Sequence, residues 1–189
     1  MLHQTLSFIL VLACCLVSPA QTTETKAAKA ARSVAVLGDF ENIRHFTEDA
    51  EGYRLQLWRE GKQIFGLLSI YTGAPYDPPT GMLEEVKFDP RTRQFSFSAR
   101  LSLGLTHNGE KWVATRDGFT FKGVLGRNEI SGTLRQYDLF LPQSTPLSKR
   151  IKLRRSRVAT QEMLPPPQSY AAWKQWAEES ILSQLGPKW

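Results

Sequence analysis

The sequence predicts an all-β domain, roughly an eight-stranded antiparallel up-and-down barrel, followed by one C-terminal α-helix. First, apolar and polar residues alternate with period two in successive strand-length segments from Ser33 onward. Second, short turn sequences rich in Gly, Asn and Asp separate most of these segments, which favours antiparallel neighbours. Third, one amphipathic segment with helical spacing follows a proline run near the C-terminus. An open β-sandwich is the competing architecture, but only a closed barrel leaves no edge strand.

The N-terminal segment has the features of a cleavable secretory signal peptide. Residues 1–20 contain no Lys, Arg, Asp or Glu, and an apolar run from Leu6 to Val17 precedes small residues at 18–20. The run is shorter than the roughly 20 residues that a membrane-spanning helix requires. We therefore expect cleavage near Ala20 and export to the periplasm or the cell exterior. Lipidation at Cys14 is the alternative, because the residues before it resemble a lipoprotein cleavage box.

Cysteine content and charge restrict the chemistry of the mature chain. Cys14 and Cys15 both lie in the predicted signal, so disulfides, thiolate nucleophiles and cysteine-ligated zinc are excluded after cleavage. The net charge of +6 falls entirely on the rest of the chain. Such a protein is attracted to anionic lipid heads, polyanionic wall material or acidic proteins. Nucleic acid is not expected as a partner in this compartment, and no later segment predicts a transmembrane span.

The barrel domain is expected over residues 33–160, after a flexible tether at 21–32. Alternation is clearest in Arg93–Leu103, where Phe95 and Phe97 share the apolar face. The expected strands are one that begins with Val34 and Val36, then Glu51–Glu60, Gln63–Tyr71, Met82–Phe88, Arg93–Leu103, a strand with Phe119, Phe121 and Leu125, Glu129–Tyr137, and Lys149–Val158.

The connections carry recognisable turn residues. Gly61-Lys62 places glycine first in a two-residue turn, which fits a tight hairpin. Thr72–Thr80 contains several prolines and is expected to form a loop. The remaining short turns are predicted at Asp89–Thr92, His107–Glu110 and Gly126–Asn128.

A local repeat predicts how the wall of the barrel curves. Phe121–Leu125 and Ile130–Leu134 each contain a glycine two residues after an apolar one and a leucine four residues after it. Gly123 and Gly132 would then face inward on adjacent strands. Inward glycines allow sharp coiling or close packing of a large neighbour, as a closing barrel wall requires.

The tail at residues 161–189 is predicted to be a proline-rich linker and an amphipathic helix. Pro165–Pro167 forms a stiff break, and Ser169 is suited to cap a helix over Tyr170–Leu185. Gly186-Pro187 would stop it. The aromatic stripe of this helix is expected to pack on the sheet.

The layout resembles the calycin group of lipocalin-like and avidin-like barrels. Gly38-Asp39-Phe40 in the first strand resembles their Gly-x-Trp opening, with Phe in place of Trp, and the helix after the last strand is similar to that of lipocalins. The chain departs from that pattern in having no tryptophan there, no disulfide after cleavage and no clear second or third lipocalin motif. The resemblance implies that a small apolar ligand binds inside the barrel.

Aromatic side chains supply the candidate ligand-binding residues. They either line a cavity for a small apolar or amphipathic ligand or simply fill the interior of a small barrel. Arg155 has inward parity, unless a bulge reorients it, and would serve as a carboxylate clamp at the barrel mouth. The aromatic candidates are Tyr53, Phe65, Phe95, Phe97, Phe119 and Phe121.

A basic segment supplies the candidate residues for an anion or partner. In the strand at 149–157, Ile151 and Leu153 point inward, whereas Arg150, Lys152 and Arg154 form an outward row. Together with Trp173 and Trp176 of the helix, this row predicts contact with an anionic envelope surface or a protein partner. The competing interpretation is a solvated strand whose charges discourage pairing between sheets.

Catalytic, metal-binding and cofactor signatures do not emerge from the sequence. There is no Gly-x-Ser-x-Gly, phosphate loop or dinucleotide fingerprint. Outside the predicted signal, the histidines are His45, beside Glu48 and Asp49, and His107 in a turn. We therefore expect no metal, no cofactor and an exported non-enzymatic β-barrel. Binding of a small apolar or amphipathic ligand is the first functional hypothesis, an envelope interaction module the second and an uncharacterised enzyme the third.

Overall fold

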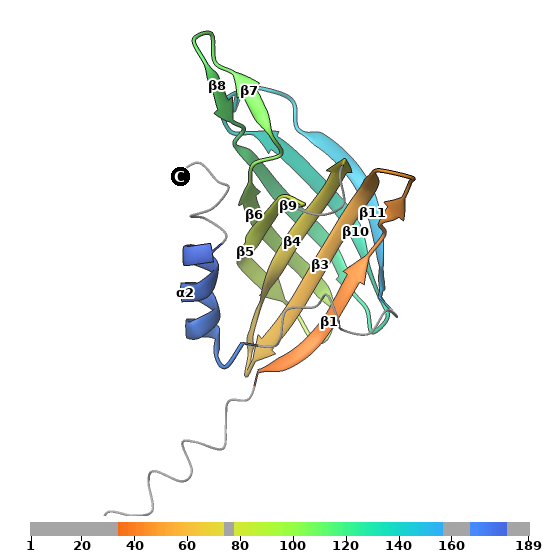
Figure 1. The fold of residues 1–189 in the computed structure, drawn as a ribbon. Coiled ribbons are helices and arrows are strands. Elements are labelled where there is room, and N and C mark those ends of the chain that lie inside the picture. Colours follow the sequence, from red (N-terminus) through yellow and green to blue (C-terminus); the bar gives the residue numbers. More distant parts are fainter. Residues whose placement is uncertain (1–33, 74–77, 157–166, 181–189) are drawn as a thin grey trace, which may run out of the picture. The chain divides into compact units, whose positions relative to one another are not determined.

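The computed structural model describes residues 34–73, 78–156 and 167–180 (Figure 1). The predicted signal peptide, the tether at 21–32 and the end of the helix from Ile181 onward lie outside the described residues. Those expectations therefore stay predictions.

Eight antiparallel strands close into a barrel, which confirms the predicted fold class. Around the ring the strands follow the order β1-β11-β10-β9-β6-β5-β4-β3, and pairing of β1 with β3 completes the circle. The strands are β1 (Ala35–Glu41), β3 (Ala50–Glu60), β4 (Gln63–Gly73), β5 (Thr80–Phe88), β6 (Gln94–Leu101), β9 (Asp117–Leu125), β10 (Glu129–Asp138) and β11 (Leu147–Arg155).

Three short strands were not predicted. β2 (Arg44–His45) pairs with β3, while β7 (Leu105–His107) and β8 (Trp112–Ala114) form a separate hairpin between β6 and β9. The predicted turn at His107–Glu110 is the tip of this hairpin. The predicted strand over Arg93–Leu103 is shorter than expected, because the backbone N–H of Leu103 donates to side-chain oxygens of Thr115 and Asp117 instead of to a neighbouring strand.

Inward side chains of all eight barrel strands form one buried cluster. Its period-two spacing reproduces the apolar face predicted for β6. Gly123 and Gly132 are cross-strand partners, and the Phe121 ring lies over both. A Cβ atom on Gly132 would lie 2.6 Å from Cζ of Phe121 and would also collide with the carbonyl oxygen of Lys122. The two glycines therefore provide the close packing that the repeat predicts.

Helix α2 (Tyr170–Ser180) packs on the outer face of β3 and β4. Trp173 contacts Phe65, with ring centroids 5.0 Å apart, and the same cluster contains Trp58. The N-terminus is capped as predicted, since the N–H of Ala172 donates to Oγ of Ser169 at 3.1 Å.

Phe65 corrects one expectation. It was predicted to face the interior, but it lies on the outer face of β4 beneath α2. The segment Gln63–Tyr71 is apolar at nearly every position, so its pattern does not distinguish the two faces. β4 is buried on both sides, by the barrel interior and by the helix.

Candidate functional site

The other predicted aromatic residues do face the barrel interior. Tyr53, Phe95, Phe97, Phe119 and Phe121 belong to or pack against the inner cluster. The rings of Phe97 and Phe121 stack with centroids 5.3 Å apart, and Phe95 lies 5.7 Å from Phe97. These rings therefore contact one another inside the barrel. Their binding of a small ligand stays a prediction.

Arg155 lies at one end of the barrel and is engaged with the backbone. Its guanidinium is 4.9 Å from the ring centroid of Phe40, and it donates to the carbonyl oxygens of Arg127 and Leu37. A Cβ atom on Gly38 would lie 2.8 Å from its Cζ. The ladder between β1 and β11 consists of two residue pairs, so Arg155 reinforces the shortest seam of the ring. These contacts give it a structural role.

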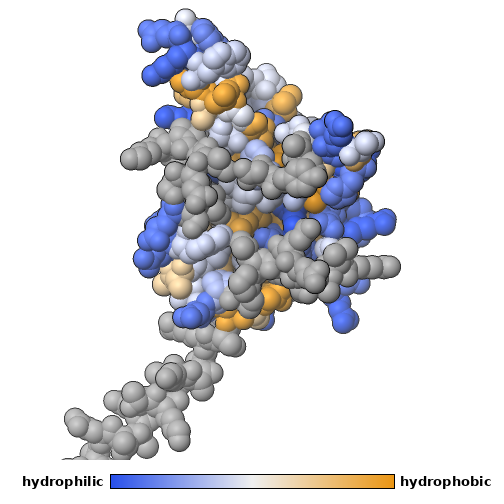
Figure 2. Space-filling model, in the orientation of Figure 1, coloured by the Kyte–Doolittle hydropathy of each residue, from blue (hydrophilic) through white to orange (hydrophobic). Residues whose placement is uncertain are grey.

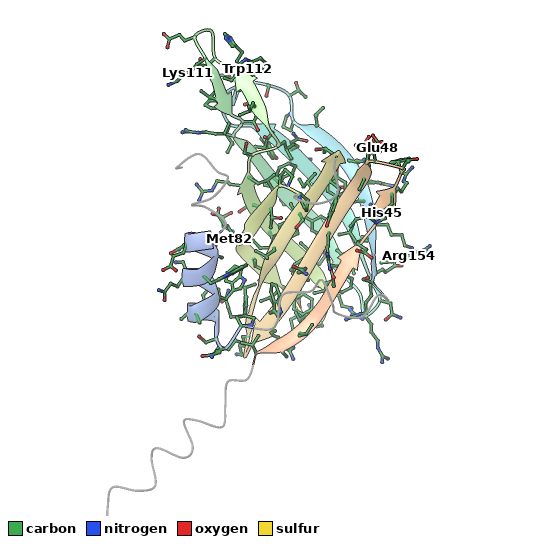
Figure 3. All side chains as sticks on the ribbon, viewed as in Figure 1. His45, Glu48, Met82, Lys111, Trp112 and Arg154 are labelled. Carbon is green, nitrogen blue, oxygen red and sulfur yellow. The ribbon has the colours of Figure 1, made fainter. Side chains whose placement is uncertain are left out.

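The basic row on β11 is arranged as the sequence predicts. Ile151 and Leu153 are buried, whereas Arg150, Lys152 and Arg154 are exposed on the outside. Figure 3 shows Arg154 on the outside of the barrel beside β11. On this side of the barrel the surface in Figure 2 is mostly hydrophilic.

Strand register combines this row with residues of β10 and β9. On β10, Thr133 is paired with Arg150 and Ser131 with Lys152. On the other side of β10, Lys122 of β9 is also paired with Thr133. Long cationic side chains therefore flank Thr133 on both sides, whereas Ser131 lies between Lys152 and Val124.

This arrangement produces a hollow of about 580 Å³ on the outer face, which we call the β10 groove. Its floor is the backbone and short side chains of β10, and its walls are the cations of β9 and β11. The lining residues are Gln94, Lys122, Gly123, Val124, Ser131, Gly132, Thr133, Arg150, Ile151 and Lys152.

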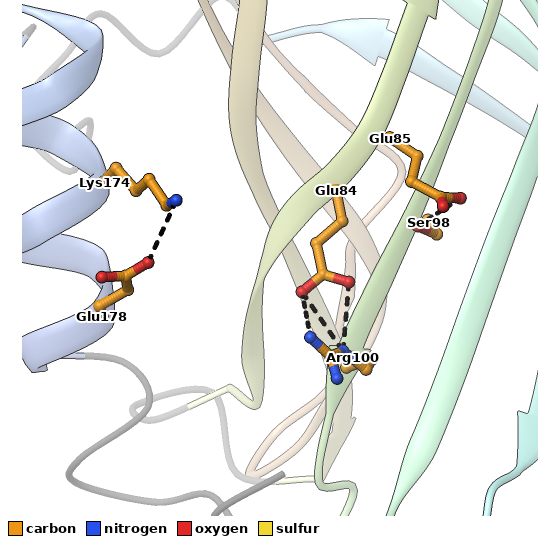
Figure 4. A network of polar contacts seen from close by, with 6 residues as sticks. All are labelled: Glu84, Glu85, Ser98, Arg100, Lys174 and Glu178. Atoms are coloured by element: carbon orange, nitrogen blue, oxygen red, sulfur yellow. Dashed lines mark hydrogen bonds and ion pairs between the residues drawn. The ribbon is translucent and has the colours of Figure 1, made fainter.

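The positive charge in the groove is only partly compensated. Lys152 forms an ion pair with Glu129 at 2.9 Å. Within the described ranges, Lys122 and Arg150 form no ion pair with a carboxylate. By contrast, the outer face of β5 and β6 pairs Arg100 with Glu84 at 2.7 Å (Figure 4). Lys122 on β9 and Arg150 on β11 are therefore uncompensated cations within the groove.

Tyr137, on the outer face of β10, reports the same positive field. A hydrogen bond from the Thr120 hydroxyl lowers the pKa of Tyr137, and the charges of Arg135 and Lys122 lower it further. Cations favour the phenolate form of tyrosine, so the smaller contributions of Arg135 and Lys122 have the sign expected for nearby positive charge.

Arg154 lies in a different hollow, at the seam between β1 and β11. This hollow has a volume of about 790 Å³ and contains the carboxylates of Glu41 and Glu129 beside Arg154 and Arg155. Its lining carries both signs of charge, whereas the described lining of the β10 groove includes cations and no carboxylate.

The helix tryptophans differ in exposure. Trp173 is 2% exposed because it packs against Phe65, so it is not available to a partner as predicted. Trp176 is 38% exposed. Trp173 is therefore not part of an exposed contact surface, and contact of Trp176 with a partner stays a prediction.

The described histidines lie at the C-terminal ends of two short strands. Nδ1 of His107 accepts a hydrogen bond from the N–H of Gly109, and its ring packs on Trp112. His45 lies in β2. Over the described ranges, no three His, Cys, Asp or Glu side chains gather where they could hold a metal ion. Nor does that part of the chain contain a helix with the length and apolarity to cross a membrane.

Comparison with protein-family models, curated proteins and solved structures gives no match for this chain. The closed eight-stranded antiparallel barrel with one helix is nevertheless consistent with a calycin-like barrel.

Sequence reasoning found one wall of the groove and missed the rest. Arg150 and Lys152 stand out because the segment around them is dense in cations. Lys122 is a single cation between Phe121 and Gly123, and its outward parity was the only available signal. Ser131 and Thr133 become relevant only through their pairing with strands on both sides.

Proposed function

We propose that this domain is a non-catalytic binding module that holds an anionic group in the β10 groove. The observation that carries the proposal is the placement of two uncompensated cations, Lys122 and Arg150, on opposite sides of Thr133. Charged donors form the stronger hydrogen bonds to carboxylate and phosphate, and a hydroxyl between them adds a neutral donor.

The expected partner is an anionic surface of the cell envelope. An exported chain with a net charge of +6 is drawn toward such a surface, and the groove supplies a defined point of contact. This develops the envelope-interaction hypothesis. We also propose that the barrel is distantly related to calycin-type barrels. The interior offers less support for a small apolar ligand, because aromatic rings contact one another there.

Isothermal titration calorimetry with inorganic tripolyphosphate tests the groove. We would use the chain from Gln21, the expected mature start, since both buried clusters come entirely from later residues. The double variant Lys122→Glu, Arg150→Glu should bind about tenfold more weakly or worse, because attraction is replaced by repulsion. Rising salt should weaken wild-type binding.

The matched control is Lys62→Glu, Lys111→Glu, which changes net charge equally on two exposed turns. Figure 3 shows Lys111 on the β7–β8 hairpin, well away from Arg154 on β11. The control should retain wild-type affinity. Equal loss in both double variants would show that net charge alone attracts the probe and would refute the groove.

A further inference from the structure

A second hollow adjoins the β10 groove on the outer face of the barrel. Its volume is about 350 Å³, and it shares two lining residues, Gln94 and Lys122, with the groove. The two hollows are therefore neighbours. We call the second one the Lys87 hollow; its lining residues are Lys87, Phe88, Asp89, Gln94, Phe95, Ser96 and Lys122.

Strand register places cations and hydroxyl groups alternately across this surface. Lys87 of β5 is paired with Ser96 of β6, and Ser96 with Lys122 of β9. The same row continues through Thr133 of β10 to Arg150 of β11. Neighbouring strands lie about 4.8 Å apart, so successive cations are separated by about 10 Å and the row spans about 19 Å. We call these five residues the cation row.

We propose that the cation row binds a linear acidic polysaccharide that crosses the strands from the β10 groove into the Lys87 hollow. The inference rests on the proposed function and names the ligand class of that site. A polymer with charges at intervals can engage Arg150, Lys122 and Lys87 in turn. Each additional contact is then intramolecular, which raises affinity with chain length.

The groups between the cations favour a sugar polymer over a polymer of bare charges. Ser96, Thr133 and the Gln94 amide donate and accept hydrogen bonds, as sugar hydroxyls require.

Among the described residues, Asp89 is the one carboxylate that lines the Lys87 hollow. It accepts hydrogen bonds from the Thr92 hydroxyl at 2.7 Å and from the N–H of Arg91 at 2.9 Å. These bonds hold the carboxylate in its own turn, and within the described ranges it forms no ion pair with Lys87.

Galacturonate oligomers test the inference, with affinities of the dimer and the dodecamer measured by calorimetry at one low salt concentration. The wild type should bind the dodecamer at least about tenfold more tightly. Lys87→Glu should remove most of that advantage and lower dimer binding much less, because the dimer fits the β10 groove alone. Lys111→Glu, with the same charge change, should leave both affinities unchanged.

Equal affinity for dimer and dodecamer, or a dodecamer affinity that Lys87→Glu does not lower, would overturn the inference. The proposed function would still stand if tripolyphosphate binding depended on Lys122 and Arg150. A linear polyphosphate that bound as tightly as the dodecamer, with Ser96→Ala leaving both unchanged, would refute the polysaccharide assignment. Absence of binding to every probe would refute the proposed function as well.

Discussion

Tyr137 is a single-residue reporter of the field around the β10 groove. Its pKa lies below the ordinary value of 10.0, first through the Thr120 hydroxyl and then through Arg135 and Lys122. The double variant Lys122→Gln, Arg135→Gln should therefore raise the pKa of Tyr137 toward 10. Absorbance titration of tyrosinate, with Tyr137→Phe subtracted to isolate this residue, measures the shift.

The lowered pKa of Tyr137 also determines how this residue changes the stability of the fold with pH. The folded state binds the phenolic proton more weakly than the unfolded state, so Tyr137 contributes stability above its unfolded pKa. That contribution is lost as pH falls through the lower folded pKa. An unchanged Tyr137 pKa after both cations are neutralised would show that they exert no field at β10.

The sequence predicts the direction of the Arg155 side chain but not the contacts that it makes. It has the inward parity expected from β11, but its guanidinium stacks on Phe40 and bonds to backbone carbonyls. Arg155→Ala should lower the free energy of unfolding by about 1–2 kcal/mol, through lost hydrogen bonds and cation–π contact. Urea unfolding measures this.

Arg127→Ala is the control for that measurement. Arg127 offers its backbone carbonyl to Arg155, and alanine retains that carbonyl. Its effect should stay within about 0.5 kcal/mol, as for ordinary surface changes. Similar losses in the two variants would contradict the structural role of the Arg155 side chain.

At the level of elements, the glycines of β9 and β10 shape the wall beneath the groove. Gly132→Ala would drive a methyl group into Phe121 and the Lys122 carbonyl. We expect a loss of about 3 kcal/mol in unfolding free energy, because the obstacle includes backbone and not only a flexible side chain. Thermal unfolding provides the measurement.

Gly73→Ala is the matched control, because it makes the same substitution. At this position nothing lies within 4 Å of the place that the added Cβ would take. Its melting temperature should stay close to that of the wild type. If Gly132→Ala were equally harmless, the close packing of Phe121 over β10 would be wrong.

Helix α2 and strand β4 show how elements share an apolar surface. β4 presents Ile64 and Leu68 to the barrel interior and Phe65 and Leu67 to the helix. The helix therefore covers apolar surface that the barrel leaves outside. This burial also accounts for Trp173, which belongs to the packing of the domain.

At the level of the whole molecule, charge is distributed unevenly around the barrel. Glu84 of β5 forms an ion pair with Arg100 of β6. Asp39 of β1 forms an ion pair of 2.6 Å with Arg54 of β3. That bond raises the pKa of Arg54 above its already high ordinary value. Within the described ranges, Lys122 of β9 and Arg150 of β11 form no ion pair, so location as well as net charge defines the candidate site.

Local pattern was sufficient for much of the architecture. Alternation around Phe95 and Phe97, turn residues at Gly61 and the cap at Ser169 each concern a few adjacent residues. Such features depend on strand pleat, turn geometry and helix termini, which neighbours in sequence control. The outward direction of Arg150 and Lys152 follows in the same way.

The groove itself depends on which segments become neighbours when the ring closes. Lys122 lies beside Thr133, and Thr133 beside Arg150, through hydrogen-bonded register between separate strands. Likewise, the uniformly apolar pattern of β4 does not specify which of its faces meets α2. Period-two alternation reports the direction of each side chain but not the residue opposite it, and that pairing arises from closure and packing of the complete barrel.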